Sequence, residues 1–207
     1  DIIKKIFLEN NDYSESITHR KRDPKNPPPV KRKADQIITS EEKEKYYSKL
    51  EQIIDKESQK AFYSIPNVLE IKKSNRKIQF LSFLSEWCPN CEYEAIELKR
   101  YINKYDSLVD FSIIMMFSSQ SRSDHFMSNF GLNSESIDPE CLVKNELLNE
   151  RTSFFKFRAC IGDSRKWGVP LHVIRVVDLN GERMFSIKGE TVKKEIRNFL
   201  NKNLKKS

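Results

Sequence analysis

The sequence is short of glycine and contains no long apolar run. Only 5 of its 207 residues are glycine, whereas average usage of roughly 7% would give about 14. No stretch approaches 18 consecutive apolar residues, which excludes a membrane-spanning helix within these boundaries. The chain starts at Asp1 rather than at a methionine, and its first residues lack the pattern of a secretory signal peptide.

Charge and aromatic side chains are abundant by contrast. Lys and Arg number 37 against 30 Asp and Glu, which gives a formal net charge of +7. The 13 Phe, 7 Tyr and 2 Trp are enough to build the core of a domain. The length suggests one ordinary domain together with an additional segment.

The first 64 residues differ in composition from the rest. Residues 1–38 combine a proline run with many basic residues, which predicts an extended basic arm or linker. No aromatic residue lies between Arg20 and Lys33, so we expect no nucleic-acid binding and interpret the arm as a tether to a membrane or a partner. A capping box at Thr39 predicts a helix over 39–64 that packs on the following domain or on a partner.

Residues 65–207 are predicted to form an α/β domain. Strands that alternate with helices indicate a mostly parallel sheet, to which the Asn180-Gly181 turn adds an antiparallel hairpin at the edge. One helix is expected to begin with Asp138 as its N-cap. In chain order we expect a strand over 78–84, a helix over 89–105, a strand over 111–117, helices over 123–130 and 138–149, strands over 171–177 and 184–187, and a final helix over 192–204.

The motif Trp87-Cys88-Pro89-Asn90-Cys91 lies where a buried strand is predicted to turn into a helix. Two cysteines three residues apart across the first helical turn can close a small disulfide. The free backbone amides of the helix N-terminus stabilise the thiolate of the first one. Pro89 suits the first helical position. We therefore expect Cys88 to be the exposed nucleophile and Cys91 the more buried resolving thiol.

Two further cysteines, Cys141 and Cys160, leave alternatives open. They could form a structural disulfide, or they could be buried thiols that behave as small apolar side chains. A zinc site that includes the C-x-x-C motif needs a second pair of ligands at a similar short spacing. Cys141 and Cys160 are 19 residues apart, so we expect no metal.

The tripeptide Gly168-Val169-Pro170 opens a predicted strand. A proline at the start of a buried strand lacks a hydrogen-bond donor for the ladder, and a cis peptide bond explains its presence. A cis bond would place the Val169 backbone beside the C-x-x-C motif, where it could pair with an extended peptide. The alternative is an ordinary trans proline that begins an edge strand.

Together these residues resemble the thioredoxin superfamily over roughly residues 65–204, and the helical insertion between 117 and 167 is similar to its TlpA/ResA-like branch. The resemblance implies a thioredoxin-like fold with a central mixed sheet flanked by helices. It implies a thiol-disulfide oxidoreductase that acts on protein thiols and disulfides together with a redox partner protein and needs no cofactor beyond its own disulfide. The residues that it assigns are the redox pair Cys88 and Cys91 with the intervening Pro89 and Asn90, and a substrate-binding set of Trp87, Val169 and Pro170.

The sequence also departs from this family. Classical thioredoxins carry a buried acid at the position of Ser82, and the Pro-Asn dipeptide between the cysteines matches neither a typical reductant nor a strong oxidant. The direction of electron flow therefore stays open, as does an alternative function as a structural or assembly subunit. His172 is interpreted as a packed strand residue. We expect an extracytoplasmic protein, periplasmic or membrane-anchored after processing of a precursor, with an organelle lumen as the alternative.

Overall fold

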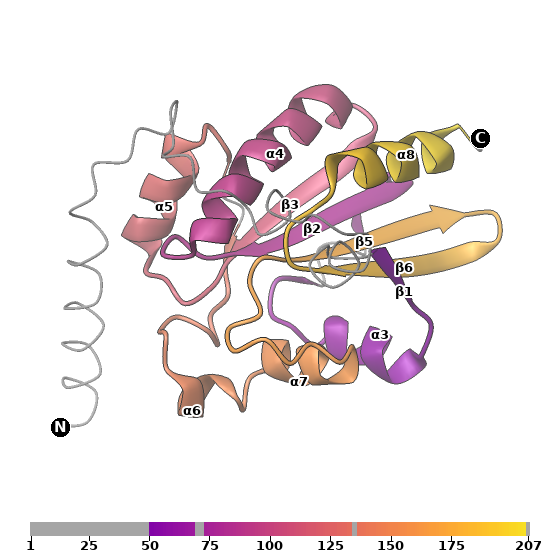
Figure 1. Ribbon diagram of the computed structural model, residues 1–207. Coiled ribbons are helices and arrows are strands. Elements are labelled where there is room, and N and C mark those ends of the chain that lie inside the picture. The colour runs from indigo at the N-terminus through magenta and orange to yellow at the C-terminus, as the bar shows by residue number, and fades with distance from the viewer. Residues whose placement is uncertain (1–49, 69–72, 134–135, 206–207) are drawn as a thin grey trace, which may run out of the picture.

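The computed structural model describes residues 50–68, 73–133 and 136–205 (Figure 1). The predicted arm over 1–38 and the first part of the predicted helix over 39–64 lie outside these residues. The described chain forms a six-stranded sheet with the strand order β1-β6-β5-β2-β3-β4. Its strands are β1 (Leu50–Ile53), β2 (Ile78–Leu84), β3 (Val109–Met115), β4 (Ser136–Ile137), β5 (Leu171–Asp178) and β6 (Gly181–Lys188). Its helices are α3 (Lys56–Phe62), α4 (Pro89–Tyr105), α5 (Gln120–Asn129), α6 (Glu146–Asn149), α7 (Ser153–Cys160) and α8 (Lys193–Leu204).

The sheet is mixed. Strand β2 pairs in parallel with β3, and β3 in parallel with β4. On its other side β2 pairs antiparallel with β5, which continues through a two-residue turn at Leu179 and Asn180 into β6, whose first residue, Gly181, pairs with Asp178. The predicted hairpin is therefore present, but it is not the edge of the sheet, because β1 pairs antiparallel with β6. This arrangement confirms the predicted thioredoxin-like fold class, a central mixed sheet flanked by helices. The expectation of a mostly parallel sheet is wrong, because three of the five pairings between the described strands are antiparallel.

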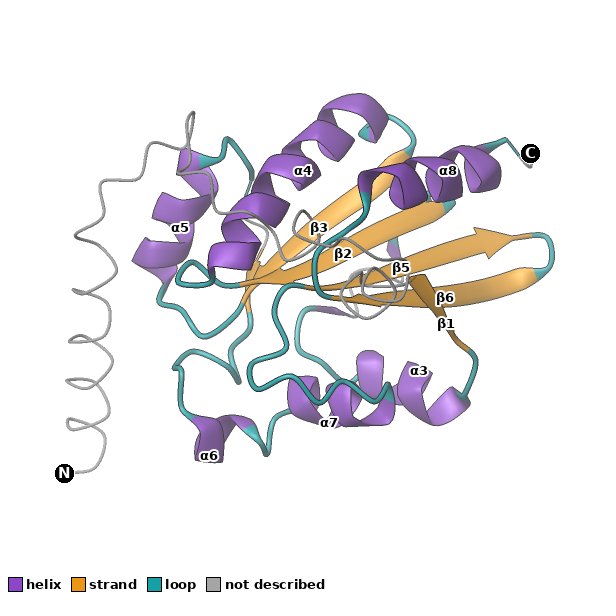
Figure 2. Cartoon of the chain, in the orientation of Figure 1, coloured by secondary structure: helices purple, strands orange, loops and turns teal. Residues whose placement is uncertain are grey.

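Helices cover both faces of the sheet and enclose two apolar clusters. Helices α4 and α8 lie on one face, while α3 and α7 lie on the other (Figure 2). Strand β2 supplies both clusters because its side chains alternate: Phe80 and Leu84 belong to the first, Leu81 and Phe83 to the second. All seven residues of β2 are buried, so this strand is the centre of the molecule. No helix in the described ranges is long and apolar enough to span a membrane.

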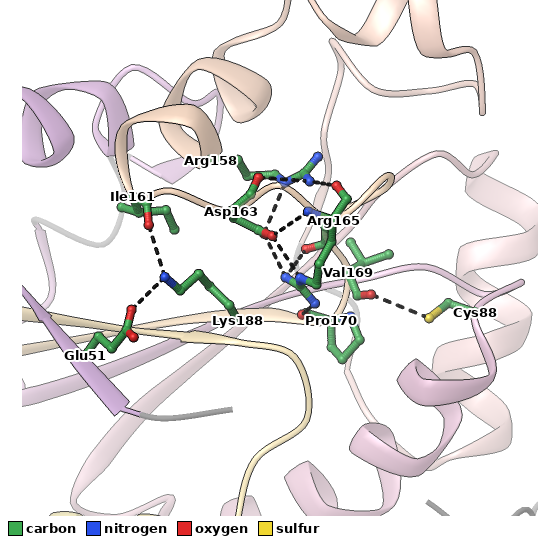
Figure 3. Close-up of polar contacts among 10 residues, drawn as sticks. Glu51, Cys88, Arg158, Ile161, Asp163, Arg165, Val169, Pro170 and Lys188 are labelled. Atoms are coloured by element: carbon green, nitrogen blue, oxygen red, sulfur yellow. Dashed lines mark hydrogen bonds and ion pairs between the residues drawn. The ribbon is translucent and has the colours of Figure 1, made fainter. Parts of the chain in front are cut away.

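Residues 50–64 correct the prediction of one continuous helix. Leu50–Ile53 form strand β1, and a separate helix begins after Asp55, whose side chain accepts a hydrogen bond from the Ser58 amide at 2.7 Å. Backbone pairing with β6 satisfies groups that would otherwise be unpaired at the sheet edge, and Ile53 becomes buried. Lys188 on β6 adds a salt bridge to Glu51 at 2.6 Å, visible in Figure 3.

Residues 138–149 correct a second prediction. Asp138 does accept hydrogen bonds from the amides of Glu140 and Cys141, as an N-cap would, but no helix follows. Helix α6 begins only at Glu146, after its own N-cap Asn145. Helix α7, capped by Thr152, was not expected at all. An aspartate that caps a turn gives the same local pattern as one that caps a helix, which explains the error.

Candidate redox site

The C-x-x-C motif lies at the junction of β2 and α4, as the sequence predicts. Cys88 is the N-cap of α4, with extended backbone angles of φ −90° and ψ 113°, and Pro89 follows in the first helical turn. The Cys88 carbonyl accepts the amide hydrogen bonds of Cys91 at 2.9 Å and Glu92 at 3.3 Å. Both are free thiols, and Cys91 is fully buried, as expected. The expectation of an exposed Cys88 is wrong: it is only 7% exposed, because the Val169 carbonyl lies against its sulfur. Asn90 is exposed.

The two thiols are perturbed in opposite directions. A hydrogen bond from the Cys91 thiol and the backbone amides of Cys91 and Asn90 lower the pKa of Cys88, and the charge of Arg165 adds to this effect although burial opposes it. Burial, the hydrogen bond to Cys88 and the charge of Glu94 raise the pKa of Cys91 well above its usual value. The pair is therefore divided into one thiol that ionises readily and one that keeps its proton.

The Gly168–Pro170 loop lies against Cys88. The Val169–Pro170 peptide bond is cis, the conformation expected from the sequence. The Cys88 thiol donates a hydrogen bond to the Val169 carbonyl, with sulfur and oxygen 3.8 Å apart (Figure 3). The structure thus brings the cysteine motif together with Val169 and Pro170. Val169 is 81 residues away from Cys88 in the chain.

An aromatic cluster forms the side of the site next to Trp87. The rings of Trp87 and Trp167 are 5.9 Å apart, and Phe117 packs on both at 6.2 Å and 5.5 Å. Lys144 places its ammonium nitrogen 3.6 Å from the centroid of the Trp87 ring, within the range of a cation–π interaction. Phe117 has a positive φ of 57°, which is strained for a bulky residue. Sequence reasoning missed Phe117 and Lys144, because a backbone angle and a contact across loops leave no sequence signal.

A buried polar network lies between β2, β5 and α4. Ser82, at the position of the thioredoxin acid, contacts His172 across the strand pair, with Ser82 Oγ and His172 Nδ1 2.9 Å apart. The fully buried Glu94 carboxylate accepts hydrogen bonds from the amide and hydroxyl of Thr191 at 2.8 and 2.7 Å. His172 Nε2 lies 3.7 Å from Glu94 Oε1. Burial lowers the pKa of His172 to about 3, so the ring is neutral.

Glu94 is the acid that sequence reasoning missed. It follows Cys91 by three residues on α4, so both side chains lie on one side of the helix. That spacing was the available signal. The burial of Glu94 could not be foreseen, because Glu92 and Glu97 give the same stretch of α4 the composition of an exposed surface.

Cys141 and Cys160 are not joined by a disulfide in the structure. Cys141 is buried beside Thr152, with Sγ and Oγ1 3.5 Å apart, and Cys160 is exposed at the end of α7. Of the two alternatives, the structure favours free thiols, although only Cys141 is a buried one. Within the described ranges, no group of three or more His, Cys, Asp or Glu side chains is arranged to hold a metal ion.

No family model and no curated protein matches the sequence. The solved structures that the chain resembles include a thiol:disulfide interchange protein of the thioredoxin family from Chlorobium tepidum, at 18% identity over 62% of this chain and 80% of the other, with a TM-score of 0.45. They also include a secreted thiol-disulfide isomerase from Corynebacterium glutamicum, at 15% identity over 65% and 74%, with a TM-score of 0.46. A secreted disulfide oxidoreductase from Mycobacterium tuberculosis matches at 18% identity over 61% and 81%, with a TM-score of 0.42. These values are too low to support an inference, so the fold assignment rests on the strand order and the site on its own geometry.

Proposed function

We propose that the protein is a thiol-disulfide oxidoreductase that exchanges electrons with protein thiols and disulfides through Cys88 and Cys91. The observation that carries this proposal is the division of the pair. Cys88 is the N-cap of α4, is 7% exposed and has a lowered pKa, and Cys91 is fully buried and has a raised one. A thiolate is the attacking species in disulfide exchange, and the second thiol must stay protonated until it is needed.

The proposed reaction balances without a cofactor. The Cys88 thiolate attacks one sulfur of a substrate disulfide, so that bond breaks, a mixed disulfide with Cys88 forms, and the other substrate sulfur leaves as a thiolate. Cys91 then loses its proton and attacks Cys88 Sγ, which releases the second substrate sulfur and forms the Cys88–Cys91 disulfide. The substrate gains two electrons and the pair loses two. The reverse sequence oxidises a substrate dithiol, and a redox partner resets the pair.

Glu94 is proposed to receive the proton of Cys91. The buried Cys91 thiol cannot attack before it ionises, and Ser82 offers no carboxylate at the position where thioredoxins have one. Glu94 is buried on the same helix, and its charge acts on Cys91. We expect Glu94→Gln to slow the release of the mixed disulfide, while the formation of the mixed disulfide by Cys88 is affected less.

Cysteine variants test the proposal directly. We expect Cys88→Ser to reduce the rate of protein disulfide reduction by on the order of a thousandfold or more, because the nucleophile is lost. Cys91→Ser should instead accumulate a mixed disulfide with the substrate, detected as a mass adduct on Cys88. Cys160→Ser is the matched control, because it removes an exposed thiol away from the site. If wild-type protein and all three variants are equally inert, the alternative of a structural or assembly subunit replaces this proposal.

The setting of this activity remains a prediction. The extracytoplasmic location follows from the family resemblance and the even number of cysteines, and the tether or partner contact from residues 1–64, of which 1–49 lie outside the described part of the chain. Val169 is proposed to contact the substrate because its carbonyl meets the Cys88 sulfur. Pro170 and Trp87 are proposed to contact it as well, because they are the chain neighbours of Val169 and of Cys88.

A further inference from the structure

One arginine side chain holds the backbone of the cis-proline loop on the side away from Cys88. Arg165 donates hydrogen bonds to the carbonyls of Pro170 and Gly168, both at 2.9 Å. The carbonyl between them, that of Val169, faces the Cys88 sulfur instead (Figure 3). A planar guanidinium can bind two carbonyls at once in a fixed geometry, and a lysine ammonium cannot do so in the same way. The direction of the Val169 carbonyl is therefore set by its two neighbours.

Arg165 is itself held in place by a buried carboxylate. Asp163 accepts hydrogen bonds from Arg165 Nε at 2.9 Å and from a terminal nitrogen at 2.8 Å. The second partner of Asp163 is Arg158, which is 3% exposed and donates a hydrogen bond from Nε to Asp163 Oδ2 at 3.2 Å. Burial alone would raise the pKa of Asp163, but its hydrogen bonds and the charges of Arg165 and Arg158 keep that pKa below the usual range. The carboxylate stays ionised and orients the guanidinium.

The charged groups around Cys88 make Arg165 important for the thiolate as well. The hydrogen bond from the Cys91 thiol on α4 lowers the pKa of Cys88, and the positive charge of Arg165, in the loop before β5, lowers it further. His172 on β5 is neutral, because burial and the charge of Arg165 lower its pKa to about 3. Glu94 on α4 acts on Cys91.

The remaining charged cluster lies on the Trp87 side of the site. There Glu86 faces Arg122, with Oε1 and the nearest guanidinium nitrogen 3.7 Å apart, and Lys144 lies over the Trp87 ring. Both positive groups act on Glu86. Arg165, by contrast, is a cation whose charge lowers the pKa of Cys88.

We propose that Arg165 is a positioning residue of the redox site, which fixes the Gly168–Pro170 backbone that meets the substrate. This proposal rests on the proposed function, because a loop position matters only if a substrate binds there. Arg165 does not take part in the exchange of electrons. Its effects divide into one on substrate binding, which needs the fork geometry, and one on ionisation, which needs the charge.

Two substitutions separate these effects in the full chain. Arg165→Gln removes both the charge and the planar guanidinium that binds two carbonyls, and Arg165→Lys keeps the charge alone. Lys166→Gln is the matched control, because Lys166 is the next residue, is 62% exposed and pairs with Glu146 at 3.1 Å. The first measurement is the pH profile of iodoacetamide alkylation of reduced protein, with Cys88 identified by mass spectrometry of the labelled peptide. The second is KM and kcat for reduction of a peptide disulfide.

We expect Arg165→Gln to move the alkylation midpoint of Cys88 upward and to lower its alkylation rate below the midpoint by roughly threefold. Arg165→Lys should leave the midpoint near that of the wild type but raise KM several-fold with a smaller change in kcat. Lys166→Gln should change none of these quantities.

The proposal is overturned if folded Arg165→Lys has the KM of the wild type. The additional effect of the Arg165 charge on Cys88 is overturned if folded Arg165→Gln has the same alkylation midpoint as Lys166→Gln. Thermal unfolding followed by tryptophan fluorescence reports whether each variant folds. If Arg165→Gln does not fold, Arg165→Lys still decides the positioning part. If wild-type protein shows no disulfide exchange, the proposed function fails, while the alkylation profile still decides the effect of Arg165 on Cys88.

Discussion

The Cys88–Cys91 pair and the Cys141–Cys160 pair have the same residue types in different structural positions. Cys88 lies at the N-terminus of α4, where free backbone amides point toward its sulfur. Cys160 lies at the C-terminal end of α7, where the helix presents carbonyl groups. Cys141 is buried between turns, and burial together with the charge of Asp138 raises its pKa to about 12. The comparison between Cys88 and Cys141 teaches that hydrogen bonds at a helix N-terminus favour ionisation of a thiol, whereas burial beside a carboxylate suppresses it.

The largest effect expected from this difference is in the rate of alkylation. At neutral pH a thiol of pKa about 12 is ionised to a fraction of roughly 10⁻⁵, whereas a thiol below pKa 9 exceeds roughly 10⁻². We therefore expect reduced protein to be alkylated at Cys88 on the order of a thousandfold faster than at Cys141. Limited labelling with iodoacetamide followed by peptide mass spectrometry measures the ratio.

Unfolded protein is the control for this ratio, because in urea all four cysteines lose their environments and should react at similar rates. The comparison between the two pairs would fail if Cys141 were labelled as fast as Cys88 in the native state. Cys160 should be labelled because it is exposed, so its labelling does not count against the interpretation.

The comparison is sharpened by disturbing the Gly168–Pro170 loop, whose Val169 carbonyl contacts Cys88. Gly168 has a φ of +69°, and a Cβ there would lie 1.9 Å from Nε of the buried Arg158. We expect Gly168→Ala to lower the free energy of unfolding by about 3 kcal/mol, from backbone strain and from overpacking. Urea unfolding followed by fluorescence measures this change.

Gly162 provides a matched control for Gly168. Its φ of +68° is almost the same, but a Cβ there would meet no atom within 4 Å. Gly162→Ala should therefore lower the free energy of unfolding only through backbone strain, by about 1 kcal/mol. Equal costs at the two positions would show that contact with Arg158 does not constrain the loop, and slower alkylation of Cys88 in Gly168→Ala alone would show that it does.

The parts of the fold that were predicted from the sequence depend on local signals. The bounds of β2 and α4 match the prediction because a continuous apolar run and a proline at the helix start are strong markers. Together they place Cys88 and Cys91 correctly. The prediction of a helix at Leu50–Ile53 was wrong because the spacing of Leu50 and Ile53 suits a helix. Their pairing partner, strand β6, is more than 130 residues away in the chain. A short sequence window contains no information about such a partner.

The candidate site divides in the same way. Val169 and Pro170 were predicted because a proline before a buried strand is unusual in itself. Glu94, Arg165 and Lys144 were missed because charged residues are normally exposed, and only tertiary packing shows that Glu94 is buried and that Arg165 turns toward backbone carbonyls. Their roles depend on contacts that the sequence does not display.

A smaller effect is the pH dependence of stability that comes from Asp138, next to the second pair of cysteines. Burial raises the pKa of Asp138, beside Cys141, from 3.8 to about 6. Between these values the folded protein holds a proton that the unfolded chain releases, so Asp138 stabilises the fold less as the pH rises from about 4 through 6. Asparagine keeps an acceptor for the Glu140 and Cys141 amides without a charge. We expect the free energy of unfolding of Asp138→Asn, relative to wild type, to rise by about 2 kcal/mol between pH 4 and pH 7.

Urea unfolding at the two pH values measures this difference, and Asp124→Asn, which removes an exposed carboxylate, controls for the loss of one negative charge. A constant difference between Asp138→Asn and wild type would mean that Asp138 titrates normally in the folded protein. The same variant also tests the comparison of the cysteines. Because Cys141 stays buried when the charge of Asp138 is removed, its alkylation should remain far slower than that of Cys88, since burial is the larger cause of its raised pKa.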